Sequence, residues 1–392
     1  MSHFEADLQS RLTEIRRQDL FRQLRWLDSG HGHQIRIADQ WYLNFSSNDY
    51  LGLINHPELK EAAVKATEKY GAGAGASRLA GGSLALFRDL EEALAAFKGT
   101  QAALTFTSGY SAASGTISSL MTKDDIIILD KLVHACIVDA ARLSTAKIRV
   151  FGHNDLDALE DRLKWATAAN ASESGARKPR VLVITESIFS MDGDRAPLRE
   201  IVALKEKYGA WLMVDEAHAT GVVGRGGRGL ADELGVSQQI EIQMGTMGKA
   251  LASGGGFICG SRTLIDFLIN SARSFVFSTA PVPATAAAAD KALQIIQSEE
   301  GQRRRLALMD RVSEFNRLRQ KSDAKPDSAI VPVIVGDEAA AMSLAEKLYQ
   351  KQLLVPAIRY PTVARGSARL RVTFTANHTS AGVQLLAEAL KA

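Results

Sequence analysis

The chain has 392 residues, 46% hydrophobic and 23% charged, which is enough for two domains with packed cores. Its 47 basic and 44 acidic residues nearly balance, and a net charge of +3 gives no electrostatic case for nucleic acid or an anionic membrane as the main partner. Neither of the two cysteines, Cys136 and Cys259, lies in a CxxC or zinc-type spacing, so we expect neither a disulfide framework nor a metal site.

The N-terminal part is predicted to form an arm over residues 1–55. Its first ~25 residues are polar and rich in arginine, with a helical pattern and little core of their own. Residues 33–45 alternate like a short β-hairpin. The N-terminus has no signal-peptide core, and no apolar run approaches the ~20 residues that span a bilayer, so we expect a cytoplasmic protein without membrane contact.

From about His56 to Phe275, short apolar runs alternate with helical stretches. The expected strands are 102–107, 126–130, 148–151, 180–185, 210–215, 240–244 and 255–260. This alternation predicts a mainly parallel sheet covered on both faces, in a large α/β domain over residues 56–285. Further on, long helices accompany strand-like runs at 328–336, 353–360 and 368–375, which predicts a smaller α+β domain over residues 286–392.

Chemically active side chains follow several of these strands, at the sheet edge where open α/β sheets bind ligands. Asp215 ends one strand and His218 follows it, although an ordinary capping aspartate explains Asp215 equally well. Gly109 and Tyr110 open a helix after another strand, which is typical of a phosphate site. His134 follows residues 126–130, either as a core histidine or as a ring stacked on a flat ligand.

Lys249 is the one long cation in "GTMGKALASGGG", a stretch of mostly small residues that predicts a buried, activated amine. A lysine, a buried acid and a phosphate turn at one edge predict pyridoxal 5′-phosphate as cofactor. A dinucleotide loop at 71–82 is not expected, because that stretch follows a helix. A P-loop at Lys249 is not expected, because the upstream glycine is missing and Ala250 replaces Ser or Thr.

Several segments, among them "LNFSSNDYLGL", "TESIFSMDGDRAPL", "VDEAHATGVVGRGGRG" and "AIRYPTVARGSARLRVTFTANHT", resemble the α-oxoamine synthases over nearly the whole chain. The resemblance implies the type I pyridoxal-phosphate (aspartate aminotransferase-like) fold and a homodimer with the active site at the subunit interface. "NFSSNDYLGL" and "IRYPTVARGSARLR" favour members that condense L-alanine with a pimeloyl thioester in biotin biosynthesis. The thioester carrier, coenzyme A or an acyl carrier protein, stays open. The alternatives are a glycine C-acetyltransferase or another member of the family, and a non-catalytic protein on the same fold.

The resemblance also implies a role for each cofactor residue. Lys249 would carry the cofactor, Asp215 would pair with the ring nitrogen, and His218 would bond the phenolic oxygen. His134 would stack on the ring and contact the substrate, and with Lys249 and Asp215 it completes the expected catalytic set. The other expected cofactor contacts are Gly109, Tyr110, Ser190, Thr246, Ser278 and Thr279, of which the last two would reach the phosphate of the partner subunit.

The substrate residues follow from the same resemblance. Asn48 and Arg371 would hold the carboxylate of the amino acid, although Arg371 could instead pair with a nearby acid. Arg22 and Thr362 would contact the acyl substrate, with Arg25 as a rival to Arg22. The segment 77–79 receives no role.

Overall fold

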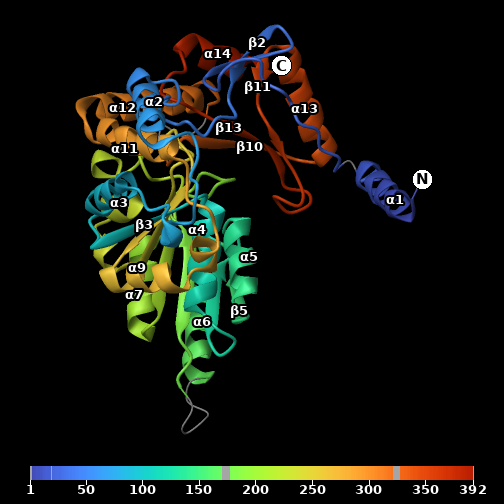
Figure 1. Cartoon of the computed structure of the whole chain (residues 1–392). Helices are drawn as coiled ribbons and strands as arrows, with labels where there is room; N and C mark the ends of the chain where they lie inside the picture. Colours follow the sequence, from blue (N-terminus) through green and yellow to red (C-terminus); the bar gives the residue numbers. More distant parts are fainter. Residues whose placement is uncertain (1, 19, 170–176, 321–326, 392) are drawn as a thin grey trace.

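The computed structural model describes residues 2–18, 20–169, 177–320 and 327–391. A large domain built on a broad sheet lies below a smaller domain in the view of Figure 1. The N-terminal helix projects away from both (Figure 1).

A seven-stranded sheet forms the centre of the large domain, with the strand order β3-β9-β8-β7-β6-β4-β5. Strand β9 runs antiparallel to β3 and β8, and the remaining neighbours are parallel. The strands are β3 (Ala102–Phe106), β4 (Ile126–Asp130), β5 (Lys147–Phe151), β6 (Val181–Glu186), β7 (Trp211–Asp215), β8 (Ile242–Thr246) and β9 (Gly256–Gly260). The predicted mainly parallel sheet is therefore confirmed.

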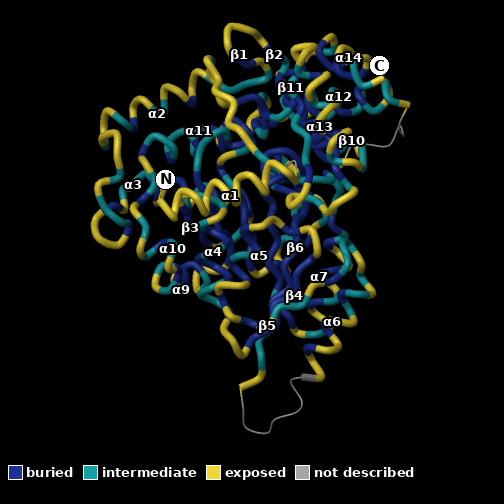
Figure 2. The backbone as a smooth tube through the Cα atoms, turned by 90° about the vertical axis from the view of Figure 1, so that its right-hand side faces the viewer, coloured by how far each residue is buried: buried dark blue, intermediate teal, exposed yellow. Residues whose placement is uncertain are grey.

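Helices cover both faces of this sheet because successive strand residues point to opposite sides. In β4, Ile126 and Ile128 join one hydrophobic cluster, and Ile127 and Leu129 join the other. The cluster on the first face includes residues of α2 (Pro57–Tyr70), α3 (Ala85–Lys98), α6 (Leu156–Ala169), α7 (Leu198–Tyr208), α8 (Leu230–Glu233) and α11 (Pro283–Gln297). The cluster on the second face includes residues of α4 (Gly109–Leu120), α5 (Ala135–Leu143), α9 (Arg262–Ser271) and α10 (Arg273–Val276). Figure 2 shows the strands as the buried centre of this domain.

The small domain holds two short sheets. One has the order β10-β13-β12 with antiparallel pairs, and the other joins β11 to the N-terminal hairpin. Its elements are α12 (Glu299–Leu318), β10 (Ile330–Gly336), α13 (Glu338–Gln350), β11 (Leu353–Leu354), β12 (Ala357–Ile358), β13 (Ala368–Thr373) and α14 (Ser380–Ala389). The strand-like run 353–360 is thus divided between two sheets. The break falls at Pro356, which has no N–H to donate to a strand ladder.

The predicted hairpin is confirmed as β1 (Gln34–Ile37) and β2 (Gln40–Asn44). Ala38 and Asp39 form its turn with φ of 45° and 64°, the left-handed region that tight hairpins require. Because β2 pairs with β11, the hairpin is hydrogen-bonded to the small domain. The division of the chain at residues 55 and 285 stays a prediction.

The N-terminal helix α1 (His3–Arg17) is shorter than the predicted ~25 residues. Ser2 and Glu5 form a capping box at its start, and the helix ends at Gln18. None of its residues is buried, as Figure 2 shows by the yellow tube. The helix stops early because no apolar face is packed to extend it, and isolated helices are marginal in water. Of the described helices, none has the length and apolar character needed to cross a bilayer.

Candidate active site

Residues that end or follow four strands gather at one edge of the large sheet. Glu186 ends β6 and Asp215 ends β7, and the two residues are paired in register. Lys249 follows β8, and Gly109 follows β3, which points in the same direction because both strands are antiparallel to β9. The carboxyl edge of the sheet therefore carries the residues that the sequence singled out.

Lys249 lies half-buried against His218, with 2.8 Å between Nζ and Nε2. Burial lowers the pKa of Lys249, although the charges of Asp215 and Glu186 oppose this shift. Burial, with the nearby Lys249 charge, lowers the pKa of His218 well below its usual value. His218 is therefore neutral, and Lys249 is brought closer to the free amine that acts as a base or nucleophile.

A hydrogen-bond chain connects Lys249 to the small domain through His218. Nδ1 of His218 lies 2.6 Å from the Tyr50 hydroxyl, which lies 3.3 Å from Oδ1 of Asn48. The same Asn48 oxygen accepts from Nη1 of Arg371 at 3.2 Å. With its proton on Nδ1, His218 donates to the Tyr50 hydroxyl and accepts from Lys249 at Nε2, and the Asn48 oxygen accepts from both Tyr50 and Arg371.

Arg371 has no carboxylate partner among the described residues, so the alternative in which it simply pairs with a nearby acid is wrong. Its Nε donates to the carbonyl of Ser190 at 2.5 Å. Arg369, two residues earlier on the same face of β13, instead forms an ion pair with Asp192. Both arginines thus reach the loop that follows β6, and Arg371 keeps donors for a ligand.

Two buried carboxyl groups, Asp215 and Glu186, lie side by side on β7 and β6. Oδ1 of Asp215 accepts from the backbone N–H of Ala217 at 2.9 Å, and no described cation pairs with it. Oε2 of Glu186 accepts from the N–H of Ser190 at 3.1 Å, and Oε1 has no partner among the described residues. Burial raises the pKa of both groups, and the Asp215 charge raises the pKa of Glu186 further. The pKa of Glu186 is therefore the one raised further above its usual value.

Sequence reasoning missed Glu186, although the signal was present. It ends a strand just as Asp215 does, and it belongs to the quoted "TESIFSMDGD" segment. Only the parallel pairing of β6 with β7 shows that the two carboxyl groups are neighbours.

The turn before α4 has the geometry of an anion site. Oγ of Ser108 accepts from the N–H of Ser111 at 3.0 Å and caps the helix. The N–H groups of Gly109 and Tyr110 have no acceptor within the helix and point out of its positive end. A Cβ on Gly256 would lie 2.6 Å from the Ser108 carbonyl, so only glycine lets β9 approach this turn.

Three further predicted contacts surround this turn. Thr246 ends β8, and its hydroxyl donates to the Gly255 carbonyl at 2.9 Å. His134 is exposed and caps α5 by accepting from the N–H of Cys136, so the core-histidine alternative is wrong. Tyr110 is 50% exposed. Both rings are therefore accessible to a ligand.

Ser278 and Thr279 stand apart from this cluster in the segment between α10 and α11. Thr279 forms an isolated bridge with Ser77, and no described contact joins either residue to Lys249. Within one chain, the structure therefore does not bring these two residues to the site.

The acyl-substrate candidates lie where the N-terminal arm meets the small domain. The carbonyl of Phe21, next to Arg22, accepts from Nη2 of Arg359 at 3.0 Å. The N–H of Thr362 donates to the carbonyl of the same Arg359 at 3.0 Å. Arg22 is exposed and makes no hydrogen bond with a described residue. Arg25 stacks over the ring of Tyr349 on α13, 4.4 Å from its centroid, which leaves Arg22 as the freer of the two.

Comparison with known proteins places this geometry in a family. Residues 41–390 match the family described as aminotransferase class I and II. An 8-amino-7-oxononanoate synthase from Geobacter sulfurreducens is 44% identical over 376 residues, which cover 95% of this chain and 94% of that protein. The chain belongs to the 8-amino-7-oxononanoate synthase family. The resemblance to the α-oxoamine synthases is thereby confirmed.

Solved structures agree with the fold of this family. A serine palmitoyltransferase from S. paucimobilis with PLP–myriocin bound superposes with a TM-score of 0.90 at 27% identity, covering 100% of this chain and 98% of that one. An 8-amino-7-oxononanoate synthase from Francisella tularensis gives a TM-score of 0.74 at 28% identity, covering 89% and 98%. The type I pyridoxal-phosphate fold, the cofactor and the acyltransferase class predicted from the sequence are confirmed.

The residues of this synthase fit pyridoxal phosphate. Lys249 offers an amine of lowered pKa, and Asp215 offers a buried carboxylate without a described cation. The free N–H groups at the start of α4 suit the phosphate, because a helix N-terminus attracts an anion. Among the described residues, no group of three His, Cys, Asp or Glu side chains is arranged to hold a metal ion.

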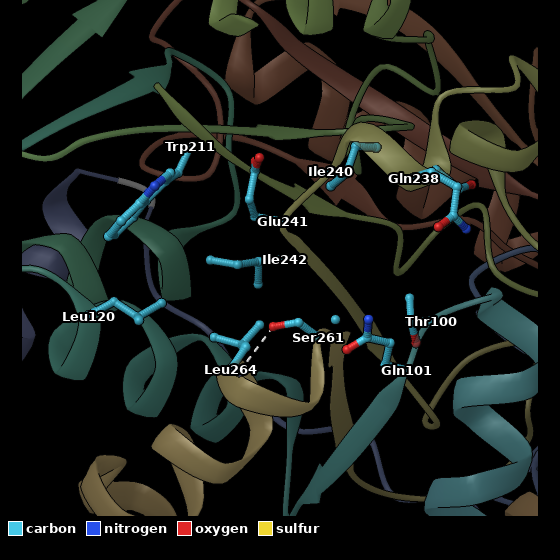
Figure 3. A pocket seen from close by; sticks show the side chains of 12 residues that line it. Thr100, Gln101, Leu120, Trp211, Gln238, Ile240, Glu241, Ile242, Ser261 and Leu264 are labelled. Atoms are coloured by element: carbon cyan, nitrogen blue, oxygen red, sulfur yellow. Dashed lines mark hydrogen bonds between the residues drawn. The ribbon is translucent and has the colours of Figure 1, made fainter. Parts of the chain in front are cut away.

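A separate hollow of about 390 Å³ lies at the opposite, amino edge of the same sheet (Figure 3). Two of its polar side chains already have partners within the fold. Glu241 accepts from Lys205 and from the N–H of Leu212, and Gln101 accepts from the N–H of Arg262. Glu241, the charged residue of this lining, is thus paired with Lys205, whereas Asp215 and Glu186 at the carboxyl edge have no described cation partner.

Proposed function

We propose that this synthase condenses L-alanine with a pimeloyl thioester, releasing the thiol and carbon dioxide and forming 8-amino-7-oxononanoate. The hydrogen-bond chain from Arg371 through Asn48, Tyr50 and His218 to Lys249 is the observation that carries this proposal. It connects a group that binds a carboxylate to a group that moves a proton. The name of the Geobacter sulfurreducens relative supports the same reaction.

Arg371 binds the carboxylate of alanine in this proposal. Its guanidinium is buried and donates to the neutral oxygens of Asn48 and Ser190 within the described part of the chain. An arginine fork holds a carboxylate through two parallel hydrogen bonds, which orients the α-carbon as well as binding it. Because Arg371 reaches the site from β13, this contact also joins the small domain to the large one.

Lys249 removes the α-proton of alanine through its Nζ. Burial favours the neutral amine that this step requires. His218, held from the other side by Tyr50, keeps the lysine side chain in place. Asp215 keeps a proton on the cofactor's ring nitrogen, because a carboxylate in a buried site stabilises the positively charged form of a group beside it. Pyridoxal phosphate supplies the electron sink that makes the α-proton acidic and that allows the later loss of carbon dioxide.

We infer that the working form is a homodimer in which Ser278 and Thr279 serve the site of the partner subunit. The surface around them is apolar for an exposed region: Phe277 is 73% exposed and Leu79 is 56% exposed. Exposed apolar patches of this kind are typical of subunit interfaces. Sedimentation of the purified protein tests this, and a monomer at assay concentration with full activity would contradict it.

A crossed panel of amino acids and acyl thioesters tests the reaction. Alanine and glycine are each combined with pimeloyl-CoA, pimeloyl-acyl carrier protein and acetyl-CoA, and thiol release is followed. We expect alanine with a pimeloyl thioester to give the highest kcat/KM. If glycine with acetyl-CoA is the better pair, the chain is a glycine C-acetyltransferase. If no pair is turned over, the proposed reaction is refuted, and the chain acts on another pair of substrates within the family or is a non-catalytic protein on the same fold.

A further inference from the structure

The glycine-rich segment 71–82 has no part in the proposed reaction. Its outer side is open, because a Cβ added to any of four glycines would meet no atom within 4 Å: Gly71, Gly73, Gly75 and Gly81. Of residues 71–81, all of which the structure describes, only Arg78 is buried. Segments with few buried contacts open easily, so this segment depends on Arg78 to keep its place.

Arg78 forms a bidentate ion pair with Glu91 on α3. Its Nη1 and Nη2 donate to the two carboxylate oxygens at 2.9 and 3.1 Å, and the two side chains are 8% and 13% exposed. Its Nε donates to the Ser83 hydroxyl at 2.8 Å, and Nη1 also donates to the Thr105 hydroxyl on β3 at 3.2 Å. Parallel hydrogen bonds of this kind fix direction as well as distance. The short 3₁₀ helix Arg78–Ala80 is therefore held against both α3 and β3.

The same stretch of chain holds the segment between α10 and α11. Ser77 and Thr279 form an isolated antiparallel bridge, and a backbone hydrogen bond of 3.0 Å beside it joins the same two segments. The guanidinium of Arg78 also lies over the ring of Phe275 on α10, 5.6 Å from its centroid, which is within the range of a cation–π contact. The position of residues 277–280 thus depends on Arg78 and on the backbone next to it.

The two segments share one surface. Leu79, next to Arg78, is 56% exposed, and Phe277, next to Ser278, is 73% exposed. This is the apolar surface that the partner subunit is proposed to cover. Thr279 is exposed as well, so it is accessible to a group outside its own chain.

We propose that Arg78 is a positioning residue for the site of the partner subunit. It holds Ser278 and Thr279 where their hydroxyl groups bind the phosphate of the partner's cofactor. Hydrogen bonds weaken steeply with distance and angle, so a small displacement of this segment is enough to lose them. The inference rests on the homodimer of the proposed function and deepens it, because Arg78 itself touches neither cofactor nor substrate.

The first measurement compares pyridoxal phosphate with pyridoxal, which lacks the phosphate. The full-length protein is equilibrated by dialysis with a series of concentrations of either ligand, and the visible absorbance of the lysine-bound ligand gives Kd, with Lys249→Ala as the blank. Arg78→Met should raise Kd for pyridoxal phosphate about 10- to 100-fold, the loss of one hydrogen bond to a charged group. It should leave Kd for pyridoxal within about twofold, because pyridoxal has no phosphate to bind. The control Lys205→Met breaks another ion pair of the large domain, with Glu241 at the amino edge of the sheet, and should change neither Kd.

The second measurement shows which subunit Arg78 serves. A heterodimer purified with two different tags combines an Arg78→Met subunit with a Lys249→Ala subunit. Only the first subunit can hold the cofactor through Lys249, and in the proposed arrangement its phosphate is bound from the second subunit, whose Arg78 is intact. Kd of this heterodimer for pyridoxal phosphate should therefore return to within about twofold of the wild-type value.

Two results would overturn the inference. Equal losses of affinity for both ligands would show that Arg78 only stabilises the fold. A heterodimer as weak as the Arg78→Met homodimer would show that Arg78 acts within its own subunit. Should Arg78→Met fail to fold, because it leaves Glu91 charged and buried, Arg78→Lys takes its place in both measurements. Lysine keeps a charge opposite Glu91 but loses the fork, so Kd for pyridoxal phosphate alone should rise several-fold, and the same two results count against the inference.

The wild type separates this inference from the proposed function. A wild type that sediments as a monomer at assay concentration refutes the homodimer, and the inference falls with it. A dimer that binds the cofactor but turns over no substrate pair refutes only the proposed reaction.

Discussion

The buried ion pair between Lys98 and Glu216 gives the sharpest prediction about stability. Lys98 ends α3, and Glu216 lies between Asp215 and His218 in the active-site loop. The two side chains are 1% and 0% exposed. Lys98 also donates to the carbonyl of Arg228, and Oε1 of Glu216 accepts from a backbone N–H at 3.0 Å. The pair therefore holds the loop that positions two predicted cofactor contacts.

The perturbation is Lys98→Met, which keeps the length of the side chain and removes its charge. Removing one partner of a buried pair leaves the other charge uncompensated and typically costs about 3–5 kcal/mol. An unfolding entropy of about 2.1 cal/mol/K per residue over 392 residues gives about 0.8 kcal/mol/K, so the melting temperature should fall by about 4–6 °C. The second variant adds Glu216→Gln, which removes the stranded charge without changing the shape. The Glu216 carboxylate packs closely against Gly229, where an added Cβ would lie 2.3 Å from it, so a substitution that keeps the shape of the side chain is chosen.

Thermal and urea unfolding of the apoprotein, followed by circular dichroism, measures both variants and the Glu216→Gln single variant. Working without cofactor removes the stabilisation that a bound ligand adds to the folded state. We expect the double variant to recover at least half of the stability that Lys98→Met loses, because neither charge remains buried alone. A loss below about 1 kcal/mol for Lys98→Met would refute the reasoning, and so would a double variant as unstable as the sum of the two single changes.

Lys249→Ala should abolish turnover while the fold is kept. Borohydride reduction of the wild type should fix the cofactor on the peptide that contains Lys249, and peptide mapping that finds the label on another lysine would contradict the assignment. Asp215→Asn should lower kcat about 10²-fold, since removing a stabilising charge from a site shielded from water costs ~3 kcal/mol; a near-normal rate would show that its charge is not needed. Arg371→Lys should raise the KM for alanine several-fold or more because lysine cannot form the bidentate contact, and an unchanged KM would move the carboxylate site elsewhere. Burial lowers the pKa of His153, but hydrogen bonds with its two aspartate partners outweigh this and raise the pKa to about 10. Since the folded pKa exceeds the unfolded value, the stability that His153 contributes is complete below about pH 6.5 and is lost as the pH rises through about 10. His153→Gln should therefore flatten the fall in unfolding free energy over this pH range, and an unchanged slope in urea titrations would refute the assignment.

Much of the fold could be predicted because its signals are local. Each of the seven strands is a short apolar run bounded by turn residues, and hydrophobic periodicity identifies such runs without any tertiary knowledge. The ends of α1 and the division of residues 353–360 could not be predicted in this way. The first depends on whether another part of the chain covers the helix, and the second depends on which sheet each half of the segment joins.

For the candidate site, the sequence by itself determined the types of group present and their placement at strand ends. Lys249, Asp215 and Gly109 stand out because their own neighbours are apolar or small, and the carboxyl ends of parallel strands must share an edge. Only the tertiary structure decided which charges are satisfied. Arg369 and Arg371 look alike in the sequence, yet one pairs with Asp192 and the other has no described carboxylate partner. No sequence pattern singles out Arg359. In the structure it contacts the Phe21 carbonyl, more than 300 residues away in the chain, and is buried without a described anion. Hydrophobic periodicity can be read from consecutive residues, whereas the pairing of a buried charge with an opposite charge depends on segments that meet only when the chain folds.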